Sequence, residues 1–192
     1  GAAALAELGA LRRLDLQYTP LTDLVAPIIG RLDHLEQLTL KKTSVGDATV
    51  AALACGSLRY LDLDGTAVTG STLNPDVLVN LESLHITDTQ LTLEGMKRIA
   101  ALPALKALML FDVPISDAML AQLEGHPTLE YIDLTFSPVS PHAVLKLIES
   151  LPRLNKFGRA LGSFRGPEEI GAYVAQLRTA SPDAVGVDPA DL

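Results

Sequence analysis

Four side chains between residues 62 and 88 are the best candidates for chemistry in this sequence. They are three aspartates and one histidine, namely Asp62, Asp64, His85 and Asp88. Carboxylate and imidazole groups at close range bind divalent cations or exchange protons as an acid–base pair. The alternative is an ordinary ion pair between neighbouring strands. Because no nucleophile or enclosed pocket accompanies these residues, the ion pair is the favoured interpretation, and we predict no catalytic residue and no metal ligand.

The other reactive groups and motifs also argue against catalysis. Cys55 is the only cysteine, and at the end of a predicted helix it is best interpreted as a small, partly buried apolar residue rather than a nucleophile. The sequence contains no phosphate-binding loop, dinucleotide fingerprint, His-Glu-x-x-His or Gly-x-Ser-x-Gly motif. We therefore predict that the chain is not an enzyme and requires no cofactor.

A recurring phrase gives these candidates their positions. It reads Leu-x-x-Leu-x-Leu-x-x-Thr, with relaxed copies, and successive copies begin 24, 23, 23, 24, 24 and 25 residues apart. The copies, of which the last is degenerate, begin at Leu11, Leu35, Leu58, Leu81, Leu105, Leu129 and Leu154. A fixed period of this length is typical of a leucine-rich repeat, in which stacked coils share one long core.

Each copy predicts a short strand followed by a helix. Around Leu61 and Leu63 apolar and polar residues alternate, which indicates a half-buried strand. We expect parallel strands centred near Leu14, Leu38, Leu61, Leu84, Leu108 and Ile132. The threonine that closes four of the phrases is expected to bond the backbone of the bend through its hydroxyl. Helices are expected to begin at Thr22-Asp23, Gly46-Asp47, Ser116-Asp117 and Ser140-Pro141.

The predicted fold class is an α/β, right-handed leucine-rich repeat solenoid, with a parallel sheet on the concave face and helices on the convex face. Residues 1–162 are predicted to form about six to seven repeats, beginning with a partial repeat that leads us to expect further repeats upstream. Residues 163–192 are predicted to form a capping helix and a tail, because Pro167 and two glutamates open a helix there. Gly70 and Pro75 predict a less regular helix in the third coil.

The repeats resemble two groups of leucine-rich repeat proteins over about residues 11–161. One comprises bacterial repeats of similar length, including the GALA type, and the other comprises the cysteine-containing repeats of F-box substrate receptors. This chain has threonine at the cysteine position of the second group. Both groups are recognition modules, so the resemblance implies a recognition role.

Aromatic residues are concentrated on the predicted concave face. The chain has four Tyr and four Phe residues, and five of these eight occupy outward positions on this face: Tyr18, Tyr60, Phe111, Tyr131 and Phe136. Exposed aromatic side chains on a rigid sheet are typical anchors of a protein interface. The alternative is that they cover neighbouring strands by cross-strand packing.

The same face is acidic, with a basic corner near Lys41. We predict that a partner protein with a basic segment binds there. The alternative is that the acids only keep the sheet soluble. The predicted partner-binding residues are Tyr18, Tyr60, Asp62, Asp64, His85, Asp88, Phe111, Asp112, Tyr131, Asp133 and Phe136.

Composition excludes several other classes. The formal net charge of −8 argues against nucleic acid and anionic membranes as partners, since both require clustered Lys and Arg. No apolar run reaches the length of a membrane span, and the first residues lack the basic start of a signal peptide. With one cysteine and no Asn-x-Ser/Thr sequon, an intracellular, cytoplasmic location is expected.

The sequence thus predicts a non-catalytic protein–protein interaction module. Two alternatives remain open at this point. One is the substrate-recognition part of a larger enzyme, such as a ubiquitin ligase effector or receptor. The other is a structural subunit of a stable assembly.

Overall fold

The computed structural model describes residues 10–159 and 162–180. The predicted helix remnant before Leu11 lies outside these ranges except for Ala10, and the predicted tail at 181–192 lies outside them entirely. We call each repeat a coil and number the coils from the copy that begins at Leu11.

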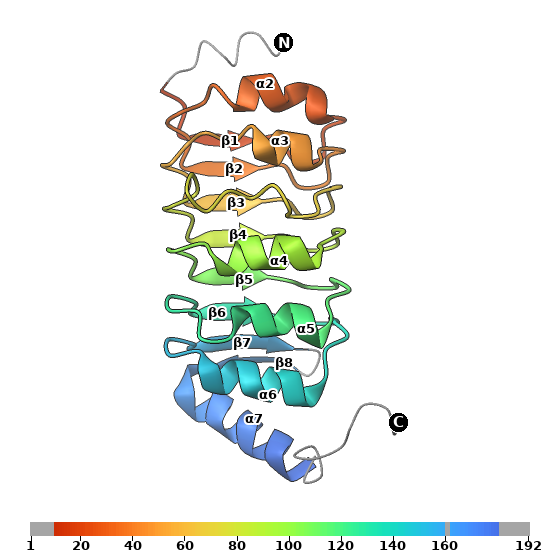
Figure 1. The fold of residues 1–192 in the computed structure, drawn as a ribbon, viewed down its shortest axis with the longest axis vertical. Coiled ribbons are helices and arrows are strands. Elements are labelled where there is room, and N and C mark those ends of the chain that lie inside the picture. Colours follow the sequence, from red (N-terminus) through yellow and green to blue (C-terminus); the bar gives the residue numbers. More distant parts are fainter. Residues whose placement is uncertain (1–9, 160–161, 181–192) are drawn as a thin grey trace.

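Eight short strands form one sheet, stacked in chain order along the long axis of the molecule (Figure 1). The strands are β1 (Arg13–Asp15), β2 (Gln37–Thr39), β3 (Tyr60–Asp62), β4 (Ser83–His85), β5 (Ala107–Met109), β6 (Tyr131–Asp133), β7 (Lys156–Arg159) and β8 (Gly162–Arg165). Neighbours from β1 to β7 are parallel, and β8 is antiparallel to β7. The predicted centres of the first six strands are confirmed, since Leu14 pairs with Leu38 and Leu108 with Ile132.

The leucines of the phrase build the core. Leu38, Leu61 and Leu84, at the centres of β2 to β4, are fully buried. Leucine side chains from successive coils therefore stack into one continuous apolar layer behind the sheet. Because side chains alternate along a strand, the residues on either side of each central leucine lie on the opposite face.

Helices cover the core side of the sheet (Figure 1). They are η1 (Asp23–Val25), α2 (Ala26–Ile29), α3 (Asp47–Ala51), α4 (Leu93–Ala100), α5 (Asp117–Leu120), η2 (Ala121–Leu123), α6 (Pro141–Ser150) and α7 (Gly166–Ala180), where η marks a 3-10 helix. The predicted starts are confirmed, and the side chains of Thr22, Ser116 and Ser140 accept hydrogen bonds from the first turns. Gly46 starts α3 without a side-chain cap.

The third coil departs from this pattern. Residues 63–82 form turns and extended segments but no helix, as Gly70 and Pro75 predicted. The segment lies close against α4, because a Cβ atom added to Gly95 would collide with the carbonyl oxygen of Thr69. The helical layer is therefore interrupted between α3 and α4.

Threonine hydroxyls secure the bends after the strands. The Oγ1 atoms of Thr43, Thr66 and Thr89 each donate to the carbonyl oxygen three residues earlier, at 2.6–2.7 Å. This confirms the role predicted for these residues. In the fifth coil Val113 replaces threonine, and the carbonyl of Leu110 instead accepts from Ser137 of the next coil at 2.7 Å.

Aspartates at the helix starts link one coil to the next. Oδ1 of Asp23 accepts from the backbone N–H groups of Gly46 and Thr49 and from the Thr49 hydroxyl. Burial opposes ionisation, yet these hydrogen bonds hold the pKa of Asp23 below its usual value. Asp47 accepts in the same way from Thr69. The sequence predicted only a helix-start role for these acids, so their bonds between coils are a new finding.

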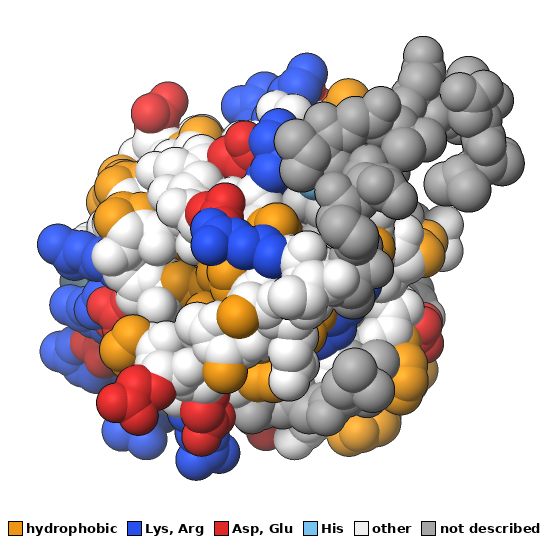
Figure 2. Space-filling model, turned by 90° about the horizontal axis from the view of Figure 1, so that it is seen from below, with side chains coloured by type: hydrophobic (Ala, Val, Ile, Leu, Met, Phe, Trp, Pro, Cys, Tyr) orange, Lys and Arg blue, Asp and Glu red, His pale blue; other side chains and the backbone are white. Residues whose placement is uncertain are grey.

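The C-terminal end of the sheet is closed by a different kind of packing. Phe157 takes the central core position in β7, and its ring stacks with Phe164 of β8 and Tyr173 of α7 at 6.3 and 5.8 Å. Ile170 and Tyr173 of α7 are buried, so α7 packs against the end of the core where the sequence predicts a capping helix. The hairpin of β7 and β8 was not predicted. Seen from this end, charged side chains of both signs lie around apolar ones (Figure 2).

Candidate partner-binding site

We use "exposed sheet face" for the side chains of β1–β7 that point away from the core, together with the bends that follow these strands. All eleven residues predicted for binding lie on it. The structure divides them into three groups, which we call the acidic cluster, the tyrosine cluster and the bend edge. The acidic cluster contains Tyr60, Asp62, Asp64 and His85, and the tyrosine cluster contains Tyr131 and Asp133. The bend edge contains Tyr18, Asp88, Phe111, Asp112 and Phe136.

The acidic cluster is more buried than the sequence predicts. Asp62 and Asp64 are only 6% and 7% exposed, although both were expected to lie on an open, solvated face. The reason is the side chains around them. The rings of Tyr60 and His85 pack at 5.0 Å, and Nζ of Lys41 lies 3.3 Å from Oδ2 of Asp64. These two acids therefore form the floor of the face rather than its contact surface.

Burial also shapes the protonation of this cluster. Burial, aided by the charge of Asp64, raises the pKa of Asp62, although the Asp64 backbone N–H and Lys41 oppose the shift. Burial and the two nearby carboxylates raise the pKa of Tyr60 to about 12. The Tyr60 hydroxyl therefore stays protonated well above neutral pH and is available as a hydrogen-bond donor.

Three of these residues are close enough to share a cation. Asp62, Asp64 and His85 each offer a ligand atom, and these atoms lie within 4.8 Å of one another. The carboxylate of Asp64 is already occupied, because Oδ1 accepts from the Thr87 N–H and Oδ2 from Lys41. A metal ion would have to displace the Lys41 ammonium. The arrangement therefore favours the Lys41–Asp64 ion pair over a metal site. The ion pair expected from sequence, between Asp62 and His85, is not found among the described residues.

The tyrosine cluster lies two strands further on. The Tyr131 hydroxyl donates to Oδ2 of Asp133 at 3.2 Å, and burial together with the Asp133 charge raises the pKa of Tyr131 to about 12. Nζ of Lys156 lies 4.0 Å from the centre of the Tyr131 ring. Sequence reasoning missed Lys156, which the degenerate last copy places directly opposite Tyr131 in the register.

The bend edge carries the most exposed aromatic residues. Tyr18 and Phe136 are 69% and 63% exposed, and Phe111 is 39% exposed. The rings of Phe111 and Phe136 meet edge to face at 5.2 Å. Asp88 and Asp112 occupy the equivalent places in the fourth and fifth coils.

The backbone of this edge is unusual. In six successive coils, the residue before the closing Thr, Val or Ser has a left-handed backbone conformation, with φ between 52° and 62°. Only one of the six residues is glycine; they are Tyr18, Lys42, Gly65, Asp88, Asp112 and Phe136. The conformation is imposed by hydrogen bonds to the next coil, such as those from Tyr18 N–H to Lys41 and from Asp112 N–H to Thr135. Gly65, Asp88 and Asp112 are of types that favour positive φ, but Tyr18, Lys42 and Phe136 are not, so the sequence does not reveal the conformation as a property of every coil.

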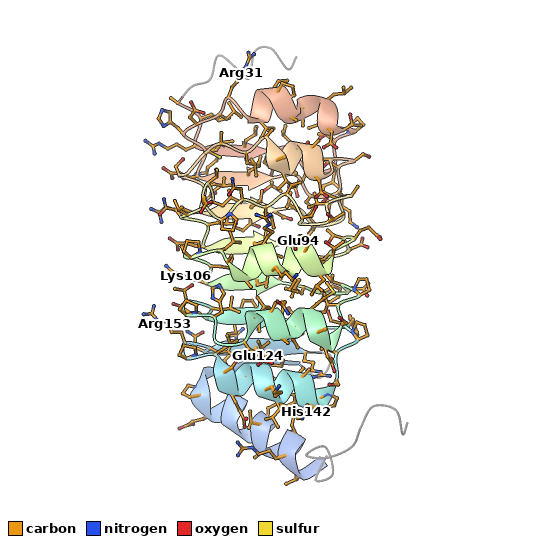
Figure 3. All side chains as sticks on the ribbon, in the orientation of Figure 1. Arg31, Glu94, Lys106, Glu124, His142 and Arg153 are labelled. Carbon is orange, nitrogen blue, oxygen red and sulfur yellow. The ribbon has the colours of Figure 1, made fainter. Side chains whose placement is uncertain are left out.

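The opposite edge of the sheet, where the strands begin, is lined by ion pairs. Arg59 and Lys106 both bond the carboxylate of Glu82 from the coils on either side, and these contacts lower the pKa of Glu82. Lys106 and Arg153 are visible along this edge in Figure 3, while Glu94 lies on α4. Basic side chains thus line the edge where the strands begin, whereas Lys41 and Lys42 pair with aspartates at the other end of β2.

Two buried groups lie away from the exposed sheet face. Cys55 is 1% exposed and burial raises the pKa of its thiol, which agrees with the predicted apolar role, although α3 ends before it at Ala51. His126 is 4% exposed, and its Nε2 has no hydrogen-bond partner among the described residues. Burial lowers the pKa of His126. Sequence reasoning missed this histidine, which stands before a proline where two other coils have leucine.

Comparison with known proteins agrees with this architecture. Residues 77–100 match the family model described as "Leucine Rich repeat". The matched segment contains β4 and α4, and together with the mostly parallel sheet it supports a leucine-rich repeat protein. No curated protein matches the chain significantly. Within the described ranges, no helix has the length and apolar character to cross a membrane.

Proposed function

We propose that this chain is a non-catalytic protein-binding module whose partner docks on the exposed sheet face. Leucine-rich repeats generally mediate protein–protein interaction. The likeness of the repeats to the GALA-type and F-box receptor groups supports the same role. The proposal treats the coils as a right-handed solenoid, since crossovers between parallel strands are almost always right-handed, with the exposed sheet face on its concave side.

The observation that carries the proposal is the separation of aromatic from aliphatic residues. In the described part of the chain, the core between β1 and β6 is built mainly from Leu, Ile and Val and contains no Tyr or Phe, while Tyr18, Phe111 and Phe136 are exposed on the other face. Aromatic side chains bury large areas at little entropic cost and dominate the energetics of interfaces. Their exposure on a rigid sheet therefore supports a docking surface.

The charges on this face define what the partner must carry. Asp15, Asp88 and Asp112 are exposed, whereas Asp62 and Asp64 are buried and Lys41 forms an ion pair with Asp64. The exposed acids are the ones that steer association, because a buried pair contributes little to the long-range field. The partner is accordingly expected to present Lys or Arg beside apolar groups.

The test compares variants of the two faces in capture experiments from a cell extract. Tyr60→Ala combined with Tyr131→Ala alters the exposed sheet face without touching the bend edge. Lys97→Ala and Gln122→Ala alter exposed positions on the helical side. A protein captured by the parent chain and the helical-side variants, but not by the double variant, supports the proposal.

Folding is checked by thermal denaturation of every variant. If the helical-side changes abolish capture while the double variant retains it, and all proteins remain folded, the partner binds elsewhere and the proposal is wrong.

A further inference from the structure

A hollow lies on the bend edge between the fourth and sixth coils. Its volume is about 450 Å³, and three successive bends form its walls. Asp88, Asp112 and Phe136 supply the charged and aromatic walls, and Pro114 and Pro138 supply apolar ones. The prolines limit the conformations of these bends, so the hollow has a defined shape before any partner arrives.

The two aspartates of this hollow differ in their partners. Oδ2 of Asp88 accepts from Nζ of Lys42 at 2.6 Å. In the part of the chain that the structure describes, Asp112 forms no ion pair, and its side chain is exposed. The hollow therefore holds one negative charge that a cation from outside can meet.

The ring of Phe136 provides a second element for binding a cation. It is 63% exposed, and its edge-to-face contact with Phe111 at 5.2 Å orients it. The face of an aromatic ring attracts a cation, and a planar guanidinium also stacks on it. A carboxylate and an aromatic ring in one hollow suit a guanidinium better than an anion or an apolar group.

We propose that this hollow binds an arginine side chain of the protein partner, with the guanidinium on Asp112 and against Phe136. This inference rests on the proposed function, because it supplies the partner's chemistry at one point of the docking surface. Lysine is expected to bind more weakly, since an ammonium cannot stack on the ring or bond a carboxylate with two parallel N–H groups.

The proposal is tested without knowing the partner. The isotope-labelled chain is titrated by NMR with N-acetyl-arginine amide, with N-acetyl-lysine amide, and with N-acetyl-citrulline amide as an uncharged control of the same shape. Shifts of the backbone amides at 88–90, 112–113 and 136–137 are expected with the arginine probe, smaller ones with lysine and none with citrulline. Equal shifts with citrulline, or arginine shifts confined to other residues, would overturn the proposal.

Matched variants sharpen the same titration. Asp112→Asn is expected to raise the dissociation constant of the arginine probe about fivefold, as for the loss of one exposed ion pair. Phe136→Gly is expected to weaken binding to a similar degree while keeping the bend, because glycine readily adopts its φ of 62°. Asp76→Asn, an exposed acid outside the hollow, is the control. If Asp112→Asn and Asp76→Asn behave alike, the hollow is not the site.

The outcomes separate this inference from the proposed function. Loss of partner capture by the Tyr60 and Tyr131 double variant, with no probe binding in the hollow, leaves the proposed function standing and refutes the arginine site. Probe binding that depends on Asp112, with capture unaffected by the double variant, supports the arginine site and refutes a contribution of the strand residues Tyr60 and Tyr131 to docking.

Discussion

Lys42 and Asp88 form an ion pair with a Nζ–Oδ2 distance of 2.6 Å, although a whole coil lies between them. They belong to the bends of the second and fourth coils, and the lysine stem passes over Gly65 of the third. A Cβ atom on Gly65 would lie only 2.5 Å from Cδ of Lys42. The single glycine in the row of left-handed residues is therefore what allows this pair to form.

Replacing Gly65 by alanine should break the pair and strain the bend. A non-glycine residue at φ 62° costs about 1 kcal/mol of stability, and the flexible lysine should move away. Gly125→Ala is the matched control, since Gly125 has φ 72° and open space around its Cα. Urea unfolding should show a similar loss of stability for both variants. Gly65→Ala should show an additional loss from the broken ion pair, and this additional loss should disappear at high salt. An additional loss that does not depend on salt would mean that steric overlap dominates.

The central core leucines should be sensitive to truncation. Leu84, in β4, is fully buried, and Leu84→Ala should destabilise the fold by about 2–5 kcal/mol because it leaves a cavity. Leu93→Ala, at a side chain that is 42% exposed, should cost less than about 0.5 kcal/mol. Chemical denaturation of both variants measures the difference. Comparable losses would contradict the predicted register.

His126 should make stability depend on pH. Burial lowers the folded-state pKa of His126 below the ordinary value near 6.5. The stability that depends on a neutral His126 is therefore fully present above about pH 6.5 and is lost as the pH falls through the lowered folded-state pKa. His126→Leu should remove this loss of stability at low pH, because leucine has no ionisable group.

The control is His142→Leu on α6, where the side chain is exposed (Figure 3). Thermal unfolding between pH 5 and pH 7 provides the measurement. The interpretation fails if the two variants flatten the pH dependence equally.

Glycine and alanine substitutions at Phe136 should rank in stability in the opposite order from the same substitutions at Phe111. Phe136 has φ 62°, so Phe136→Gly should be more stable than Phe136→Ala by about 1 kcal/mol. At Phe111, which is not among the residues with positive φ, alanine should be the more stable replacement by roughly 0.5–1 kcal/mol. Urea unfolding of the four variants tests this reversal. The same order at both sites would show that the side chain, rather than the backbone, determines the effect.

The repeat predicted the fold well because it specifies local structure and register together. Each copy places a leucine such as Leu61 at the centre of a strand, and a fixed period brings equivalent residues side by side. The helix starts followed from Ser116 and Ser140, whose side chains bond the first turn. The interruption in the third coil followed from Gly70 and Pro75, which disfavour a helix.

The candidate site was less predictable because its properties depend on side chains from different coils. The pattern placed Asp62 on the outward face, but its burial arises from Tyr60, His85 and Lys41 in three neighbouring coils. The left-handed bends were also hidden, since Tyr18 and Phe136 are residues that rarely adopt positive φ. Their conformation is fixed by hydrogen bonds between coils, which no single copy of the phrase reveals.

The missing helix of the third coil bears on the curvature of the stack. Parallel strands are spaced about 4.8 Å apart, whereas a helix is about 10 Å wide, so helices on one side act as wedges that bend a stack toward its sheet. Between α3 and α4 the wedge is replaced by a thin extended segment packed against Gly95. We therefore expect the stack to be straightest where Tyr60 and His85 lie, and we propose that this part of the surface suits a flat or gently convex partner.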